Sequence, residues 1–300
     1  MTAAIETAAL VKRYGKKTAL SDCTLSIPTG HVVGLVGPNG AGKTTLLQLA
    51  VGLLQPTAGQ IDVLGHKPAE DPAQLARVGF VAQDTPTLST LSVADHLRMG
   101  AKLNPGWDAY LAGQRIEELE LDPDQRAGQL SGGQRAQLAL TLAMAKRPEL
   151  IVLDEPVASL DPLARRKFLQ SLMASVAEQQ VSVVMSSHLV ADLERVCDYL
   201  VVLADSQVQL SGTVDDLLAT HHLLTGPRRE PTRWPSDWLV IEERHTERQT
   251  TLLIRSSAPI LDPAWAVETV SMEDLVLAYM GLGASQHRRD GDLPGPRRAS

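Results

Sequence analysis

The 300-residue sequence predicts an α/β fold built on a mostly parallel β-sheet. Over residues 1–220, short apolar runs alternate with longer helical patterns, as in sheets whose parallel strands are joined by crossover helices. Four of the runs are typical of strands buried on both faces, because they are short, continuously apolar and bounded by Gly, Pro or polar residues. These predicted strands are His31–Val36, Val78–Val81, Leu150–Leu153 and Val181–Met185.

Two further parts of the first 220 residues have different patterns. Short runs around Ile5–Leu10 and Cys23–Ile27 predict an antiparallel β layer beside the main sheet. Over residues 88–130 the strand patterns end, and a polar helical pattern with Pro and Gly breakers predicts an inserted helical subdomain. Apolar residues at helical spacing predict helices over Leu169–Val176 and Leu189–Leu200.

The composition changes after Gly212 and predicts a small α+β appendage. We expect a linker over residues 221–237, because Gly226–Pro231 is rich in Pro, Gly and charge. The appendage is expected over residues 238–283, and residues 284–300 form a predicted disordered tail rich in Arg, Gly and Pro. Its predicted elements are strands at Leu239–Glu243, Thr251–Arg255 and Ala266–Val270 and a helix at Met272–Met280.

Composition excludes several classes of protein. With 44% hydrophobic and 21% charged residues, the chain is neither disordered nor fibrous. Its net charge of −7 and lack of a basic face argue against a nucleic-acid partner. Two cysteines, Cys23 and Cys197, form neither a disulfide framework nor a zinc site. The apolar stretches are too short to span a bilayer, and the first residues lack the order of a secretory signal, so we expect an intracellular protein.

A phosphate-binding loop is predicted between the strand ending at Val36 and the following helical pattern. The motif G-x-x-x-x-G-K-[ST] is matched by Gly37, Pro38, Asn39, Gly40, Ala41, Gly42, Lys43 and Thr44, with Thr45 directly after it. Glycines let backbone N–H groups surround phosphate oxygens, Lys43 adds charge for the β and γ phosphates, and the Thr44 hydroxyl is a ligand for Mg²⁺. The structural alternative is a plain glycine-rich turn. The motif in this context predicts a nucleotide site on a P-loop nucleoside triphosphatase-type sheet.

Two adjacent carboxylates, Asp154 and Glu155, follow the predicted strand Leu150–Leu153 at its C-terminal end. Ligands of α/β sheets bind at that end of the strands. Asp154 is suited to hold Mg²⁺ through water, and Glu155 to polarise the attacking water as a general base. Alternatively, the pair caps the next turn, which is a common role for acidic side chains.

The segment Leu130–Arg135 resembles the signature motif of the ATP-binding cassette (ABC) family, with Ser131, Gly132, Gly133 and Gln134 opening a helix. A helix N-terminus of this kind also binds anions. The resemblance covers residues 5–220, and other family landmarks follow in order. Tyr14 resembles the residue that stacks on adenine, Gln83 the Q-loop glutamine that contacts Mg²⁺ and the reacting water, Asp161 the D-loop aspartate, and His188 the switch histidine of catalysis. Taken singly, each has an ordinary structural alternative as a surface or core residue.

Departures from the family pattern are few. Val157 and Ser159 stand where the family commonly has Thr and Gly, and Ser159 affects the turn of the D-loop. Since Glu155 and His188 are both present, the resemblance implies a hydrolysing member.

The resemblance implies ATP and Mg²⁺ as cofactors and a dimer, in which the Lys43 loop of one subunit faces the Ser131 motif of another. That second subunit is either an identical copy or a paralogue. It further implies a separate transmembrane permease that docks near residues 84–103 and places this chain at the cytoplasmic face of the membrane. Because Met272–Leu277 resembles the terminal helix of ABC-2-type efflux ATPases, we expect export of a drug, antibiotic or lipid-like compound.

Other functions stay open at this point. The chain is alternatively the ATPase subunit of an importer, or a soluble ABC ATPase that remodels a ribosome or DNA. A P-loop kinase or GTPase lacks the Ser131 motif, and the appendage is alternatively a regulatory interaction module.

Overall fold

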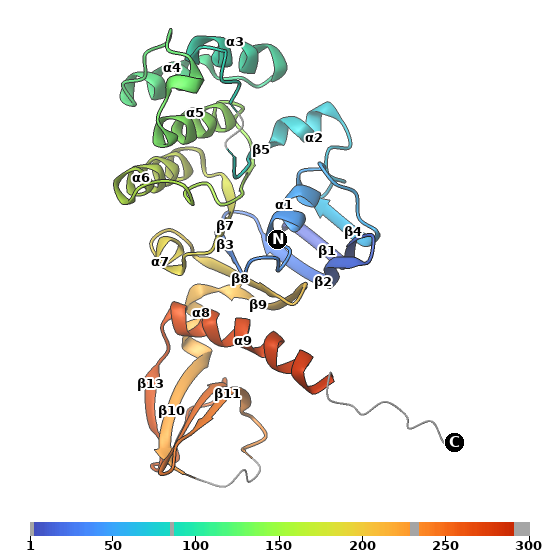
Figure 1. Ribbon diagram of the computed structural model, residues 1–300, viewed down its shortest axis with the longest axis vertical. Coiled ribbons are helices and arrows are strands. Elements are labelled where there is room, and N and C mark those ends of the chain that lie inside the picture. Colours follow the sequence, from blue (N-terminus) through green and yellow to red (C-terminus); the bar gives the residue numbers. More distant parts are fainter. Residues whose placement is uncertain (1–2, 85–86, 229–233, 291–300) are drawn as a thin grey trace, which may run out of the picture.

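The computed structural model describes residues 3–84, 87–228 and 234–290 and shows three sheets with helices between and beside them (Figure 1). Within these residues, no helix has the length and apolar character that would let it cross a bilayer.

The main sheet has six strands in the order β5-β6-β7-β3-β8-β9, which confirms the predicted α/β fold. All neighbours are parallel except β8 and β9, which pair antiparallel. The strands are β3 (Val32–Val36), β5 (Val78–Val81), β6 (Leu150–Leu153), β7 (Ser182–Ser187), β8 (Tyr199–Ala204) and β9 (Gln207–Thr213). The four predicted strands are therefore present, and their carboxyl ends meet along one edge of the sheet.

The predicted helix over Leu189–Leu200 is wrong in its second half. Helix α7 is a single turn, Val190–Leu193, and Leu200 lies on the buried strand β8. Val196 and Cys197 pack on the same apolar core as Leu193, so apolar spacing continues through a turn and into the strand. A short apolar run of this kind fits a helix or a strand equally well by periodicity alone.

A second, antiparallel sheet has the order β2-β1-β4, as predicted for the N-terminal layer. Its strands are β1 (Ala3–Tyr14), β2 (Lys17–Pro28) and β4 (Ala58–Val63). Helix α1 (Lys43–Ala50) fills the space between this layer and the main sheet, with Leu46, Leu47 and Leu49 buried in a core that includes Leu35 of β3. This packing fixes the N-terminus of α1 at the carboxyl end of β3.

Several helices come from the middle region of the chain. They are α2 (Pro72–Arg77), α3 (Val93–Leu103), α4 (Ala109–Glu118), a 3-10 turn (Ala127–Gln129), α5 (Gly132–Met144) and α6 (Pro162–Gln179). Among them, α3, α4 and α5 lie together at one end of the molecule (Figure 1). A small core of Val93, Ile116, Leu121, Leu130 and Leu138 joins α3, α4 and α5. Through this core, α3 and α4 are held over the face of α5.

The C-terminal residues form a third sheet of order β11-β12-β10-β13, preceded by α8 (Val214–Thr220) and followed by α9 (Met272–Asp290). Its strands are β10 (His221–Pro227), β11 (Leu239–His245), β12 (Gln249–Arg255) and β13 (Ala266–Thr269). The predicted strands and helix of the appendage are all present.

The expected linker and tail differ from the structure. Residues 221–227 form β10, which pairs with both β12 and β13. His221 and Leu224 of this strand are buried, and the strand ends at Pro227. Residues 229–233 of the expected linker lie outside the described residues. Helix α9 also includes residues 284–290 of the expected tail, whereas residues 291–300 lie outside the described residues.

Helix α9 joins the C-terminal sheet to the main sheet. Leu275 and Val276 are buried in one apolar core with Val202 of β8 and Leu253 of β12. Buried His221 also contacts Tyr279 of α9, with 2.9 Å between Nε2 and the hydroxyl, and desolvation lowers the pKa of this histidine. The third sheet is therefore fastened to the rest of the chain by apolar packing.

Candidate active site

The loop between β3 and α1 adopts a shape that requires glycine at two places. Gly42 caps α1 with a φ of 106°, and a Cβ atom there would lie 2.4 Å from the carbonyl oxygen of Ala19. A Cβ atom at Gly37 would lie 2.1 Å from the carbonyl oxygen of Leu203. Because both neighbours are backbone atoms, larger residues would displace the loop. The loop is thus held tightly at the N-terminus of α1, where backbone N–H groups are available to an anion.

Lys43 places a buried cation at this loop. Its side chain is 5% exposed, and Nζ donates hydrogen bonds to the carbonyl oxygens of Gly37 at 2.8 Å and Pro38 at 3.4 Å. The same Nζ lies 3.7 Å from Oε1 of Glu155. Gly37 and Pro38 therefore orient the lysine, while Ala41 is buried in the core beside the loop.

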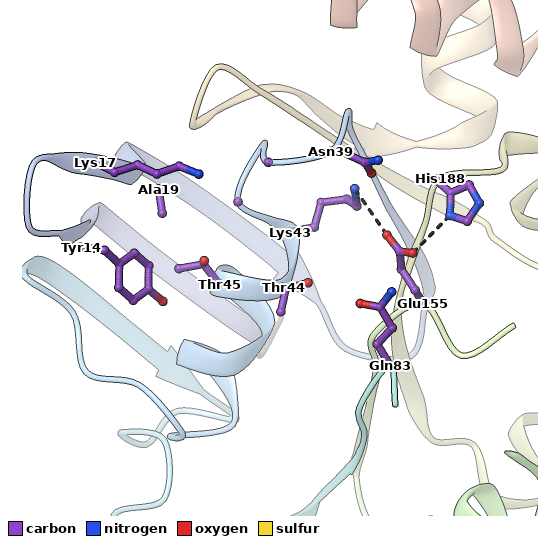
Figure 2. A pocket seen from close by; sticks show the side chains of 12 residues that line it. Tyr14, Lys17, Ala19, Asn39, Lys43, Thr44, Thr45, Gln83, Glu155 and His188 are labelled. Carbon is purple, nitrogen blue, oxygen red and sulfur yellow. Dashed lines mark hydrogen bonds and ion pairs between the residues drawn. The ribbon is translucent and has the colours of Figure 1, made fainter. Parts of the chain in front are cut away.

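Asp154 and Glu155 take different positions although they are adjacent. Asp154 is 2% exposed, and its Oδ1 accepts hydrogen bonds from Thr44 Oγ1 at 3.2 Å and from Ser186 Oγ at 2.7 Å. Glu155 has a φ of 46°, in the left-handed region that non-glycine residues adopt rarely and often at functional sites. This turn directs the Glu155 carboxylate toward Lys43 and His188 (Figure 2).

Ser186 connects the two acidic residues and was not found by sequence reasoning. Besides donating to Asp154, its hydroxyl accepts a hydrogen bond from the Glu155 backbone N–H at 2.8 Å. Ser186 is buried on β7, directly beside β6 in the sheet. Its only signal in the sequence is its place at the end of a predicted strand, two residues before His188.

His188 completes a chain of three charged or polar side chains. Its Nδ1 lies 3.2 Å from Oε2 of Glu155, so the Glu155 carboxylate stands between the histidine and Lys43 (Figure 2). These side chains come from the end of β7, the end of β6 and the start of α1. Parallel strand pairing brings together residues that are far apart in the sequence.

These side chains line a cavity of about 710 Å³ (Figure 2). The predicted residues that line it are Tyr14, Asn39, Gly40, Gly42, Lys43, Thr44, Thr45, Gln83, Glu155 and His188. Lys17 and Ala19, at the start of β2, also line it and were not predicted. Tyr14 is 47% exposed at the rim, with Nζ of Lys12 5.4 Å from the centre of its ring. The cavity thus has the aromatic ring of Tyr14 at one end and the Glu155 carboxylate at the other.

The predicted residues of the Ser131 motif and Asp161 lie elsewhere. Ser131, Gly133, Gln134 and Asp161 line a second cavity of about 840 Å³, and the two sets of lining residues do not overlap among the described residues. Gly132 is the first residue of α5. The structure therefore does not bring the Ser131 motif next to Lys43 within one chain.

Side chains at the second cavity cap their own helices. The Ser131 hydroxyl accepts a hydrogen bond from the Gln134 N–H at 3.2 Å, and Oε1 of Gln134 accepts one from the Ser131 N–H at 2.9 Å. This reciprocal pair is a capping box. Oδ1 of Asp161 accepts hydrogen bonds from the N–H groups of Leu163 and Ala164, both at 3.0 Å.

The donor set of the first cavity fits Mg²⁺. A carboxylate and a hydroxyl, Asp154 and Thr44, lie 3.2 Å apart, and the amide of Gln83 lines the same cavity. Mg²⁺ prefers oxygen ligands and is often held by one or two protein groups together with substrate phosphates. In keeping with this sparse set, no group of three or more His, Cys, Asp or Glu side chains converges on a metal position within the described ranges.

Comparison with known proteins decides the family. The family model described as "ABC transporter" matches residues 20–158. The thiamine import ATP-binding protein ThiQ of Shigella flexneri is 32% identical over 203 residues, which cover 65% of this chain and 87% of that protein. The chain belongs to the ABC transporter ATP-binding family. Both the β3–α1 loop and the Ser131 segment lie within the residues that match the family model.

Other ABC proteins match to a similar degree. The sulfate/thiosulfate import ATP-binding protein CysA of Mycobacterium tuberculosis is 34% identical over 72% of this chain, which spans 63% of that relative's length. The Nod factor export ATP-binding protein I of Mesorhizobium japonicum is 33% identical over 73% of this chain and 66% of its own length. These names support the ABC family but not the narrower prediction of ABC-2-type drug efflux.

Solved structures agree with the fold. A dimeric structure of a bacterial ABC transporter cassette superimposes with a TM-score of 0.62 and 26% identity, covering 70% of this chain and 98% of that one. The likeness therefore extends over nearly the whole of that cassette and over 70% of this chain.

Proposed function

We propose that the chain hydrolyses ATP as the nucleotide-binding subunit of an ABC transporter. The observation that carries this proposal is the Glu155 carboxylate, 3.7 Å from Nζ of Lys43 and 3.2 Å from Nδ1 of His188 at the edge of the first cavity. An acid in this position is able to polarise a water molecule beside a terminal phosphate. Tyr14, at the opposite rim, is placed to stack on a nucleotide base.

Binding of a triphosphate would change the partners of Lys43. The phosphate oxygens compete with Glu155 for the ammonium group, and release of Lys43 leaves the carboxylate free to accept a proton from water. Mg²⁺, held by Asp154, Thr44 and Gln83, would neutralise charge on the β and γ phosphates. His188 would remain beside Glu155 and donate a hydrogen bond toward the reacting phosphate.

The separation of the two cavities supports a dimer as the hydrolysing unit. Backbone N–H groups at the start of α5 are suited to a phosphate, but they line a cavity apart from Lys43 in the same chain. A second subunit, arranged head to tail about a two-fold axis, would bring its Ser131 segment to the nucleotide of the first. The dimeric cassette structure found by comparison is consistent with this arrangement.

A groove of about 400 Å³ supports docking of a separate membrane permease. It lies between the main sheet and the helices of the middle region, and its lining includes Leu53, Phe80, Met99, Leu103 and Trp107. Leu53 and Leu103, which both line this groove, are 63% and 71% exposed, and exposed apolar side chains at a groove can mark an interaction site. An apolar helix of a permease would bury them, and the chain would then associate peripherally with the membrane.

The direction of transport is a finer point, on which the relatives favour import over our export prediction. CysA and ThiQ are named for import, and one relative of similar identity is named for export. The export prediction depended on the apolar residues of α9. Leu275 is buried within this chain, so its packing against β8 explains its apolar character and gives no information on the type of transporter. ATP-dependent uptake of the substrate by intact cells would indicate import, and uptake by inverted vesicles would indicate export.

Phosphate release by the full-length chain with Mg²⁺ and ATP tests the proposal. Glu155→Gln keeps the size of the side chain but cannot accept a proton, so we expect hydrolysis to fall by about 10²–10⁴-fold. ATP binding, measured by equilibrium titration, should be retained. A Glu155→Gln variant that hydrolyses ATP at the parental rate would show that Glu155 is not the base.

A further inference from the structure

A partly buried ion pair joins helices α6 and α7, which follow the predicted site residues Asp161 and His188. Helix α6 starts directly after Asp161, and α7 starts two residues after His188. Nη1 of Arg165 on α6 lies 3.5 Å from Oδ2 of Asp192 on α7, and the side chains are 23% and 13% exposed. The pair thus connects the second cavity, where Asp161 lies, with the first cavity, where His188 lies.

The pair is incompletely bonded in this conformation. Nε of Arg165 and Oδ2 of Asp192 are buried, and neither has a hydrogen-bond partner within the part of the chain that the structure describes. Nη2 of Arg165 donates a long hydrogen bond of 3.5 Å to the carbonyl oxygen of Leu160. Charge-assisted N–H···O bonds are typically about 2.7–2.9 Å long, so both contacts have room to shorten by roughly half an ångström. A small movement of α7 toward α6 would shorten the contact between Arg165 and Asp192 and strengthen the ion pair.

Movement of α7 would be transmitted to His188 through the backbone. The Ser187 hydroxyl accepts a hydrogen bond from the Leu189 N–H at 3.0 Å, and this closes a tight turn around His188 at the start of α7. His188 in turn contacts Glu155 at 3.2 Å. Asp192 is therefore one helical turn away from the histidine that faces the carboxylate.

We propose that Arg165 is a positioning residue. By pairing with Asp192, it fixes the position of His188 beside Glu155 and couples that position to the Leu160–Asp161 loop. The inference rests on the proposed function, because it concerns the same hydrolysis. Asp161 lines the cavity that a second subunit would cover, so Arg165 provides a physical connection from that surface to the chain's own reacting groups.

The test compares Arg165→Ala, Arg165→Lys and Asp192→Asn with the parental full-length chain in Mg²⁺-ATP. We expect the kcat for phosphate release to fall about 10–100-fold in Arg165→Ala and Asp192→Asn, with KM for ATP changed less than about twofold. Arg165→Lys keeps the charge and should retain more than about a third of the rate. In the exchanged double variant, Arg165→Asp with Asp192→Arg, the rate should exceed that of Arg165→Asp alone by about tenfold or more.

Two neighbours serve as matched controls. Arg166 on α6 and Glu194 at the end of α7 are exposed, and Arg166→Ala and Glu194→Gln should hydrolyse ATP within about twofold of the parental rate. Thermal unfolding of every variant separates lost positioning from lost folding.

Three results would overturn the inference: an unchanged kcat in Arg165→Ala, an equal loss in Arg166→Ala, or a loss that merely follows the unfolded fraction. Failure of the proposed function would look different. In that case the parental chain itself would release no phosphate, or Glu155→Gln would release it at the parental rate.

Discussion

The two cavities contain similar chemistry but differ in how far one chain completes them. Around Lys43, side chains from α1, β6 and β7 already bond to one another, and Ser186 fixes Asp154 relative to Glu155. Around Ser131, the polar side chains cap their own helices, and buried Oε1 of Gln137 has no hydrogen-bond partner within the described ranges. One site is assembled by folding, whereas the other presents a capped helix N-terminus, to which a second subunit would bring the nucleotide under the proposed function.

The largest effect is expected from Lys43→Ala, which removes the cation of the assembled cavity. Charged hydrogen bonds to phosphate oxygens are each worth about 1.5–3 kcal/mol, and Lys43 is expected to make more than one to bound ATP, so ATP affinity should fall by roughly 10²-fold or more in the variant. Lys16→Ala, in the exposed turn before β2, is the control and should bind ATP normally. Tight ATP binding by Lys43→Ala, measured by titration calorimetry, would contradict the assignment of the cavity.

Substitutions of Ser131 distinguish its role as a helix cap from a role in phosphate contact at the second cavity. Ser131→Asp keeps a good helix cap and suits the helix dipole, so its free energy of unfolding should stay close to the parental value. Its carboxylate would repel a phosphate, and we expect hydrolysis to fall about 10²-fold or more.

Ser131→Ala provides the reverse comparison. It loses the cap and about 1 kcal/mol of stability, but it introduces no repulsion and should lose less hydrolysis. Denaturant unfolding and phosphate release are measured on both variants. Parental hydrolysis by Ser131→Asp would show that this helix does not face the nucleotide.

The smallest effect is expected from Ser186→Ala, which leaves the acidic residues in place but removes their link. Loss of a buried hydroxyl with two partners costs about 1–3 kcal/mol of unfolding free energy, and we expect hydrolysis to fall about tenfold. Ser182→Ala, at the other end of β7, removes a hydroxyl that accepts a hydrogen bond from the Gly30 N–H at 2.9 Å. Similar stability losses with a slower rate only in Ser186→Ala would support a role in positioning; equal rates would exclude one.

Local patterns predicted the parallel strands β3, β5, β6 and β7 and the antiparallel layer, but they missed the parallel strand β8. The predicted strands are short, largely apolar runs bounded by turn residues, so each is defined by its own few residues. Strand β10 was missed because its pairing with β12 and β13 depends on residues that follow it by more than 20 positions, while Gly226 and Pro227 suggested a break. Leu200 was assigned to a helix because an apolar residue at its position fits both the apolar face of a helix and a buried strand.

The candidate site shows the same limit. Residues 37–45 and the pair Asp154–Glu155 are visible because the chemistry lies within one short segment. Ser186 and Lys17 have no such motif, since their relation to the site depends on β7 lying beside β6 and on the β1–β2 hairpin reaching the cavity. The sequence predicted both motifs and, by resemblance, their contact between subunits, and the structure shows that within one chain they line separate cavities.

A mixing experiment tests most directly whether one ATP site is built from two chains. Lys43→Ala and Ser131→Asp are each impaired alone, but a mixed dimer contains one site with an intact Lys43 loop and an intact Ser131 segment. Two-fold symmetry predicts that an equal mixture regains phosphate release, up to about a quarter of the parental rate. A mixture no more active than the two variants measured separately would contradict the shared site.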